Sequence, residues 1–235
     1  MPRTARADTV VADVPHHIVV RGNNRRRIFS HTIDYLYFVR SLARAHAKTP
    51  LPLYACCLMS NHVHLLVRPT GADALARFMK TALQRYALFR NARVRGSGRL
   101  FEERYSAFPV RTDAHAAIVM AYIELNPVRA GIVVDAAAYR WSSSRIHCLR
   151  DASQTDPFCA LPWSELPWFR ALGADPSARA AAYATFLDEC QARDRERFFE
   201  AAWGSAAESR RRIGENAVPR EGRRPNGSRA TMSPK

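Results

Sequence analysis

Short strand-like stretches alternate with longer stretches of helical periodicity over the first half of the chain. Residues 15–22 predict a strand that is closed by a glycine. Apolar positions at three- and four-residue steps then predict a helix over about 32–49, which ends before a proline. Two further strands, at 53–59 and 62–67, are separated by only two residues and should form a tight antiparallel hairpin.

The pattern after the hairpin predicts a second helix, a fourth strand and a third helix. The second helix covers about residues 73–93 and has an apolar side opposite a basic stripe. The stripe consists of Arg77, Lys80 and Arg85. The fourth strand covers 105–111, where Pro109 favours the edge of a sheet, because proline cannot donate a ladder hydrogen bond. The third helix opens at Asp113 and continues through Tyr122.

This order of elements, β-α-β-β-α-β followed by a helix, is typical of an α+β protein with a ferredoxin-like split antiparallel sheet. In that topology the first and third strands are central and the fourth lies at an edge. We expect a catalytic domain over 14–149, a small helical appendage over 150–205 and a basic tail over 206–235. Arginine, glycine, proline and serine dominate from Arg210 onward, which predicts disorder there.

The charge of the chain indicates a polyanionic partner. The 36 Lys and Arg residues exceed the 21 Asp and Glu residues, for a formal net charge of +15. Residues 1–150 alone hold 23 basic and 9 acidic side chains, so most of the positive charge belongs to the part that should fold. A basic tail does not account for that distribution, and a solubility surface is the remaining alternative. We therefore expect the partner to be nucleic acid.

The cysteines and the hydropathy pattern bear on the compartment. The five cysteines have neither the paired spacing of a zinc ribbon nor the even count of a disulfide framework, which favours a reducing cytoplasm. No apolar run like that of a signal peptide precedes Pro15, and no stretch reaches the roughly 18 apolar residues of a membrane span. We expect a cytoplasmic, nucleoid-associated protein with no membrane partner.

Two histidines provide the first candidate chemistry. His62 and His64 are two residues apart on a predicted strand, so both imidazoles project from one face and can share one metal ion. Imidazole is a versatile metal ligand, and two of them leave positions on the ion open for a phosphate. Many half-buried strands carry two histidines without a catalytic role, so this pattern alone favours a structural explanation.

The helix that contains Tyr122 changes that balance. Tyr122 and Asn126 are four residues apart and share a helix face, and Pro127 should end the helix near Asn126. One face would then present a phenol and a carboxamide oxygen together. The alternative is a tyrosine of the core, with Asn126 as a C-terminal cap.

These two motifs and three others, all in register, resemble those of the single-tyrosine HUH transposases. The resemblance is closest to the REP-associated tyrosine transposases, which derive from small insertion-sequence transposases, and it covers about residues 14–149. The matching stretches are Arg21-Gly22-Asn23-Asn24-Arg25, the run from Met59 to Val67, Leu100 to Tyr105, Tyr122 to Gly131, and Trp141-Ser142-Ser143. Ser60 replaces the family's usual proline and Glu103 its usual glycine, and both departures lie in loops or turns.

The resemblance implies a metal-dependent reaction on single-stranded DNA. His62 and His64, with Asn126 as third ligand, would hold a divalent ion, Mg²⁺ or Mn²⁺, that stabilises charge on the scissile phosphate. Tyr122 would attack the phosphorus, giving a 5′-phosphotyrosine link and a free 3′-hydroxyl. Because a phenolate is a better leaving group than an alkoxide, the strand can be rejoined without ATP. The expected substrate is hairpin-forming repeat DNA.

A basic loop after the first strand is the expected DNA contact. Its residues would track phosphates, while aromatic side chains stack unpaired bases. The candidate DNA-binding residues are Arg21, Asn23, Asn24, Arg25, Arg26, Arg27 and, beyond the catalytic helix, Arg129. Each charge taken singly could equally be a solvated side chain.

Several alternatives stay open. One is a protein of transposase origin that binds hairpin nucleic acid without cutting it. Another is a metal-dependent phosphodiesterase that activates water, with Tyr122 in the core. The sequence also leaves open a homodimer, and whether Tyr122 acts within its own chain or in a second one.

Other residues near the predicted site have less certain roles. His17 could approach the metal from the first strand, but a histidine satisfied by its neighbours is the simpler interpretation. Glu102, Glu103 and Glu124 are candidate acids or extra ligands, and the sequence offers no means to choose among them. Tyr86 and Tyr105 are expected to be structural.

Overall fold

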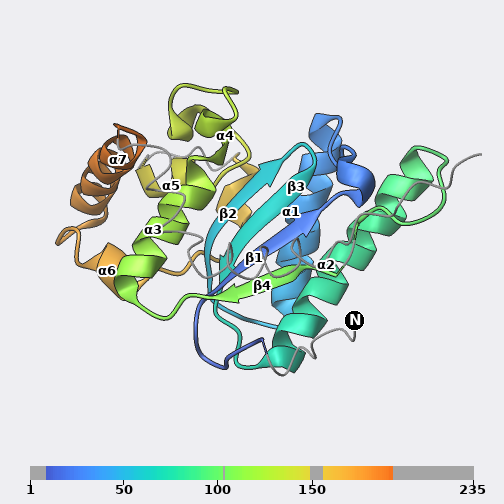
Figure 1. The fold of residues 1–235 in the computed structure, drawn as a ribbon, viewed down its shortest axis with the longest axis horizontal. Coiled ribbons are helices and arrows are strands. Elements are labelled where there is room, and N and C mark those ends of the chain that lie inside the picture. Colours follow the sequence, from blue (N-terminus) through green and yellow to red (C-terminus); the bar gives the residue numbers. More distant parts are fainter. Residues whose placement is uncertain (1–8, 103, 149–155, 193–235) are drawn as a thin grey trace, which may run out of the picture. The chain divides into compact units, whose positions relative to one another are not determined.

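A four-stranded antiparallel sheet lies at the centre of the structure, a computed structural model that describes residues 9–102, 104–148 and 156–192 (Figure 1). The strands follow the spatial order β2-β3-β1-β4, so the first and third are central and the fourth is an edge. Their bounds are β1 His16–Arg21, β2 Leu53–Met59, β3 His62–Val67 and β4 Ser106–Pro109. The α+β class and the predicted strand order are confirmed.

The pairing of β1 with β3 determines which side chains share a face of the sheet. The two strands pair over six positions, from His16 opposite Val67 to Arg21 opposite His62. Residues directly opposite each other in an antiparallel pair project to the same face. Strand β4 pairs with β1 over four residues and ends at Pro109, as its edge position requires.

Two antiparallel helices cover one face of the sheet, α1 over Thr32–Lys48 and α2 over Ala72–Arg93 (Figure 1). Helix α1 begins at a capping box in which Asp34 accepts backbone N–H groups of Ser30 and His31. The core beneath these helices joins apolar side chains of the sheet to those of both helices. It includes Ile18, Val20, Val63, Leu65, Phe38, Leu42, Phe78 and Met79.

Helix α3, Asp113–Glu124, lies against the other face of the sheet (Figure 1). Shorter elements surround it and complete a second core with β2. They are α4 Asn126–Arg129, α5 Ser144–Cys148, α6 Pro167–Arg170 and α7 Pro176–Ala192, with 3₁₀ turns at Asn23–Arg25, Ala136–Ala138 and Pro157–Ala160. None of the helices in the described ranges is long and apolar enough to cross a membrane.

The domain limits predicted from the sequence stay predictions. The described residues all belong to one compact unit, residues 1–202. The predicted basic tail over 206–235 and the first residues of the predicted appendage lie outside the described residues.

Gly22 shapes the loop that leaves β1. Its N–H donates to the backbone oxygen of Asn61, 2.8 Å away, which ties the end of β1 to the β2–β3 turn. The following chain folds back so closely that a Cβ at this position would lie 2.2 Å from the backbone oxygen of Arg26 and 2.8 Å from a side-chain carbon of Ile28. Only glycine therefore fits here without moving the backbone.

Gly22→Ala should accordingly lower the free energy of unfolding by about 1–3 kcal/mol, the usual range for overpacking. Gly71→Ala is the matched control, because a Cβ at Gly71 meets no atom within 4 Å. Urea unfolding followed by tryptophan fluorescence measures both variants. Equal midpoints for the two would contradict the steric account of Gly22.

Candidate active site

Strand β3 places two imidazoles side by side at the centre of the sheet. The ring centroids of His62 and His64 are 4.8 Å apart. Val63 and Leu65, which alternate with them, point into the core under α1 and α2, as predicted. The strand therefore presents a histidine face toward α3 and an apolar face toward the two-helix layer.

The Nδ1 atom of each of these imidazoles already has a partner. The Asn61 side-chain oxygen lies 2.7 Å from Nδ1 of His62, and because that oxygen can only accept, Nδ1 carries the proton. Nδ1 of His64 lies 2.9 Å from Nε2 of His17. Such contacts orient a histidine and leave its Nε2 as the ligand atom. The two imidazoles could therefore serve as two ligands of one metal ion.

Burial keeps these imidazoles neutral. Desolvation, reinforced by the Arg21 guanidinium, lowers the pKa of His62 to about 4. Desolvation also lowers the pKa of His64 well below its usual value, with His17 and His62 adding to the effect. The pKa of His17 falls to about 3, again mainly through burial. At neutral pH all three rings have the uncharged form that binds metal ions.

Helix α3 brings Tyr122 to the histidines. The Tyr122 ring centroid lies 5.7 Å from that of His64 and 5.8 Å from that of His17, edge-on in both cases. Arg129, seven residues further along the chain, places its guanidinium carbon 5.0 Å from the centre of the Tyr122 ring. Arg21 lies opposite His62 in the sheet. The structure thus gathers two candidate ligands, the candidate nucleophile and two arginines.

Asn126 takes the C-terminal cap position that the sequence left open as an alternative. Helix α3 ends at Glu124, and a separate turn, α4, starts at Asn126. The helix is interrupted because the Pro127 ring would clash with the backbone carbonyl four residues earlier and has no N–H to donate to it. The Asn126 side-chain nitrogen donates to the backbone oxygen of Tyr122, 2.8 Å away, as a C-terminal cap would. Among the described contacts none joins Asn126 to His62 or His64. Its side-chain oxygen remains the atom that could act as third ligand.

The predicted DNA-binding loop lies beside the same end of the sheet. Asn23, Asn24 and Arg25 form a 3₁₀ turn, and the Asn61 side-chain nitrogen donates to the Arg25 backbone oxygen at 3.3 Å. Arg25, Arg26 and Arg27 are exposed and form no ion pair with the described residues. The loop therefore presents its arginines next to the β2–β3 turn, one residue before His62.

Glu124 is buried on the opposite side of α3 and is not an extra ligand. Its carboxyl accepts hydrogen bonds from the hydroxyls of Ser143 and Tyr183, the latter at 2.8 Å. Nδ1 of His147 lies 2.7 Å from the same carboxyl. The Ser143 hydroxyl also accepts the backbone N–H of Cys56 on β2 at 2.9 Å. Glu102 is exposed, and Glu103 lies outside the described residues.

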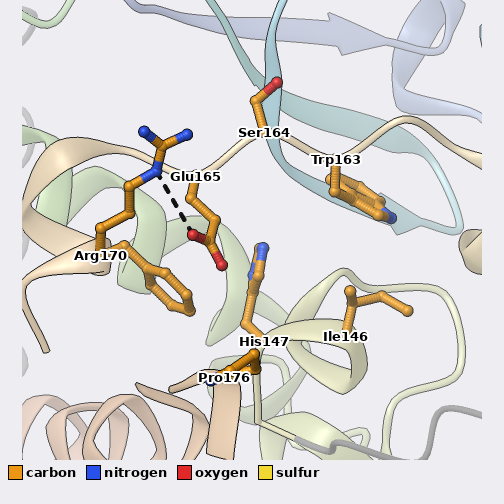
Figure 2. Close-up of a pocket in the computed structure, with 8 residues that line it drawn as sticks. Ile146, His147, Trp163, Ser164, Glu165, Arg170 and Pro176 are labelled. Atoms are coloured by element: carbon orange, nitrogen blue, oxygen red, sulfur yellow. Dashed lines mark ion pairs between the residues drawn. The ribbon is translucent and has the colours of Figure 1, made fainter. Parts of the chain in front are cut away.

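A pocket of about 430 Å³ lies on the far side of His147 from Glu124. Figure 2 shows the imidazole of His147 pointing into it, toward the side that Trp163 and Glu165 line. Glu165 is paired with Arg170 at 3.6 Å and with Arg179 at 3.4 Å. The Glu165 carboxylate is therefore already neutralised. The residues that line this pocket include none of His62, His64 and Tyr122, so it is separate from the histidine and tyrosine site.

The sequence left the roles of two of these residues, His17 and Glu124, undecided. His17 contacts His64 because it sits on the same face of the neighbouring strand, and its spacing from His62 along the chain gives no sign of that. The only available signal was its position on a strand expected to be central. Glu124 acquires its role from partners 19, 23 and 59 residues away, which no local pattern reveals.

Glu124→Gln should lower the free energy of unfolding by about 2–3 kcal/mol, because the amide keeps the shape but offers one acceptor atom where three donors converge. Glu165→Gln is the control, since its ion pairs are partly exposed and should contribute under about 1 kcal/mol. Thermal and urea unfolding would both register the difference. Equal stability of the two variants would mean that the Glu124 cluster is not a stabilising junction.

Comparisons with known proteins support membership of a transposase family. A family model described as IS200-like transposase matches residues 10–126, a range that includes His62, His64, Tyr122 and Asn126. A solved REP-associated tyrosine transposase, bound to a REP hairpin, is similar over 66% of this chain and 90% of that chain, with 18% identity and a TM-score of 0.54. A candidate transposase from Deinococcus radiodurans R1 matches over 53% of this chain and 96% of that chain, with 21% identity and a TM-score of 0.35. No curated protein matches the chain in sequence.

Proposed function

The chain belongs to the IS200-like transposase family, and from this membership we propose that it cleaves and rejoins single-stranded DNA through a covalent link to Tyr122. The observation that carries the proposal is the approach of the Tyr122 ring to His64, with ring centroids 5.7 Å apart. A phenol beside two neutral imidazoles with available Nε2 atoms is the arrangement that a tyrosine nucleophile and a metal-bound phosphate require.

His62 and His64 would hold a divalent ion, Mg²⁺ or Mn²⁺, through their Nε2 atoms, with the Asn126 side-chain oxygen as the proposed third ligand. The ion would supply Lewis-acid stabilisation of the scissile phosphate. Asn61 and His17 keep the two imidazoles in the orientation that this binding needs, because each occupies an Nδ1 atom.

The covalent step uses Tyr122 as the nucleophile. The phenol loses its proton, its oxygen forms a bond to the phosphorus, and the bond from phosphorus to the 3′-oxygen breaks. The 3′-oxygen takes up a proton and leaves as a hydroxyl, while the 5′ end stays attached to tyrosine. Arg129, over the ring, is placed to offset the negative charge that develops on the phenol and the phosphate.

The proposed partner is single-stranded DNA that carries a hairpin. This proposal is supported by the fold shared with a transposase whose solved structure holds a REP hairpin, and by the exposed arginines of the loop after β1. The short distance between Tyr122 and His64 of one chain supports a site completed within that chain. A homodimer is therefore compatible with the proposal and is not needed for the chemistry. Such a partner places the protein at the nucleoid, in the cytoplasm.

Tyr122→Phe should abolish the covalent protein–DNA adduct and keep DNA binding, because only the hydroxyl is lost and the ring still packs. The assay is incubation with single-stranded hairpin DNA and Mn²⁺, followed by denaturing electrophoresis. Tyr54→Phe, on β2 and outside the candidate site, is the control and should form the adduct as the unmodified protein does. Cleavage without an adduct in the unmodified protein would instead favour a phosphodiesterase that activates water.

His64→Ala should abolish cleavage and weaken Mn²⁺ binding by at least tenfold, because a single imidazole with one amide oxygen makes a poor site for a labile ion. Calorimetric titration measures the affinity and the adduct assay measures the chemistry. His46→Ala, on α1 and away from the site, should change neither. Normal cleavage by His64→Ala at ordinary Mn²⁺ concentration would show that the histidine pair is not the metal site.

A further inference from the structure

A groove of about 690 Å³ runs between α1 and α2, on the two-helix layer that covers the far side of the sheet from Tyr122. Its lining includes five basic side chains and no acidic one. They are Arg44 and Lys48 on α1, and Arg77, Lys80 and Arg85 on α2. The basic stripe predicted on the second helix is therefore one wall of a groove, and α1 supplies the other wall.

The positive charge of this α1/α2 groove is not neutralised by the described part of the protein. All five basic side chains are exposed, and none forms an ion pair with a described residue. Between Asp34 and Glu102 the sequence contains a single acidic residue, Asp73. Asp34 itself is buried and paired with Arg90 and Arg93. Such a concentration of like charge favours a polyanionic ligand.

The length of the groove suits several phosphates. Tyr37 stacks on Phe89 at one end, while Lys48 and Arg77 line the same groove, in keeping with an antiparallel pair of helices. From Tyr37 to Lys48 the helical rise gives about 16 Å. A nucleic-acid duplex carries about one charge per 1.7 Å of its axis, so several phosphates of one stem fall within this length.

The aromatic residues of the groove do not offer a platform for unpaired bases. The rings of Tyr37 and Phe89 lie face to face, with centroids 3.8 Å apart and planes 6° apart. The Arg85 guanidinium carbon lies 5.4 Å from the centre of the Tyr37 ring. The two rings cover each other's inner faces and Arg85 approaches Tyr37, so the groove presents mainly flexible cations, which contact phosphates and do not read bases. These features fit a base-paired stem better than a single strand.

A second basic hollow, of about 430 Å³, continues this surface across α2. It shares Arg77, Lys80 and Gln84 with the groove and adds Arg104 and Tyr105. These last two residues directly precede the edge strand β4, which pairs with β1 and places Phe108 opposite His17. The basic surface therefore extends from the groove to the edge of the sheet nearest the histidine and tyrosine site.

We propose that the α1/α2 groove binds the phosphate backbone of a base-paired stem, and that the unpaired strand passes round the β4 edge to reach Tyr122. This inference rests on the proposed function for its partner, DNA. It adds a second nucleic-acid contact, distinct from the loop after β1. The stem and the cleaved strand would be held on opposite faces of the sheet.

The test is a triple variant, Arg44→Gln with Arg77→Gln and Lys80→Gln, which removes charge from both walls of the groove. The control is Arg40→Gln with Arg68→Gln and Arg140→Gln, which removes the same charge from exposed positions outside it. Fluorescence anisotropy measures binding to two oligonucleotides of equal length, a hairpin with an unpaired 5′ segment and a strand that cannot pair. Salt is varied from about 50 to 200 mM.

The groove variant should bind the hairpin at least tenfold more weakly than the unmodified protein does. Its affinity for the unpaired strand should stay within about twofold of that of the unmodified protein. Loss of up to three phosphate contacts should reduce the salt slope on the hairpin by up to about 2.7. The control should keep the hairpin affinity within about threefold. Equal losses on both oligonucleotides, equal losses for both triple variants, or no loss at all would overturn the proposal.

The adduct assay separates this inference from the proposed function. At saturating hairpin the groove variant should form the Tyr122 adduct at the rate of the unmodified protein, because the groove takes no part in the chemistry. If the unmodified protein formed no adduct with either oligonucleotide, the proposed function would fail. The loss of affinity for the hairpin, compared with that for the unpaired strand, would still test the groove proposal. If adducts formed and the groove variant bound the hairpin normally, the groove proposal alone would fail.

Discussion

The buried carboxyl of Glu124 is the constraint on which the rest of the site depends. A carboxyl removed from water is costly unless donors surround it, and here Ser143, His147 and Tyr183 converge on it. Through Ser143 the same cluster reaches the backbone of β2. The sheet, α3 and the helices near the C-terminal end of the described chain must therefore come together at once. Tyr122 is two residues from this junction, so its position follows from it.

The candidate site shows how a sheet can orient two imidazoles before any ion binds. His62 and His64 are spaced by the strand, turned by Asn61 and His17, and kept neutral by burial. None of these contacts uses the Nε2 atom of His62 or of His64. Little reorganisation should therefore be needed when an ion binds, which is the advantage of contacts in the second layer around a metal.

Local patterns predicted the elements well, and long-range packing set the limit of that prediction. Alternation and helical spacing were sufficient for the elements, for the hairpin and for the shared face of His62 and His64, since each depends on neighbours in the chain. The strand order followed from the topology that is typical of this order of elements. The contact of His17 with His64 depends on the register between β1 and β3, which alternation alone does not give. For Asn126 the sequence allowed both a metal ligand and a helix cap, and in the structure its side-chain nitrogen caps the helix that Pro127 interrupts. Packing determines whether the Asn126 side chain acts as a cap or as a ligand, and the four-residue spacing from Tyr122 does not describe that packing.

The strict alternation of β3 also makes the candidate site depend on correct folding. If β3 paired one residue out of step with β1, both imidazoles would enter the apolar core under α1 and α2, and Val63 and Leu65 would face α3 in their place. The resulting chain would lose its core and the candidate site together. A copy of this protein with that register error would thus be unstable as well as inactive, and no stable chain with a displaced candidate site would result.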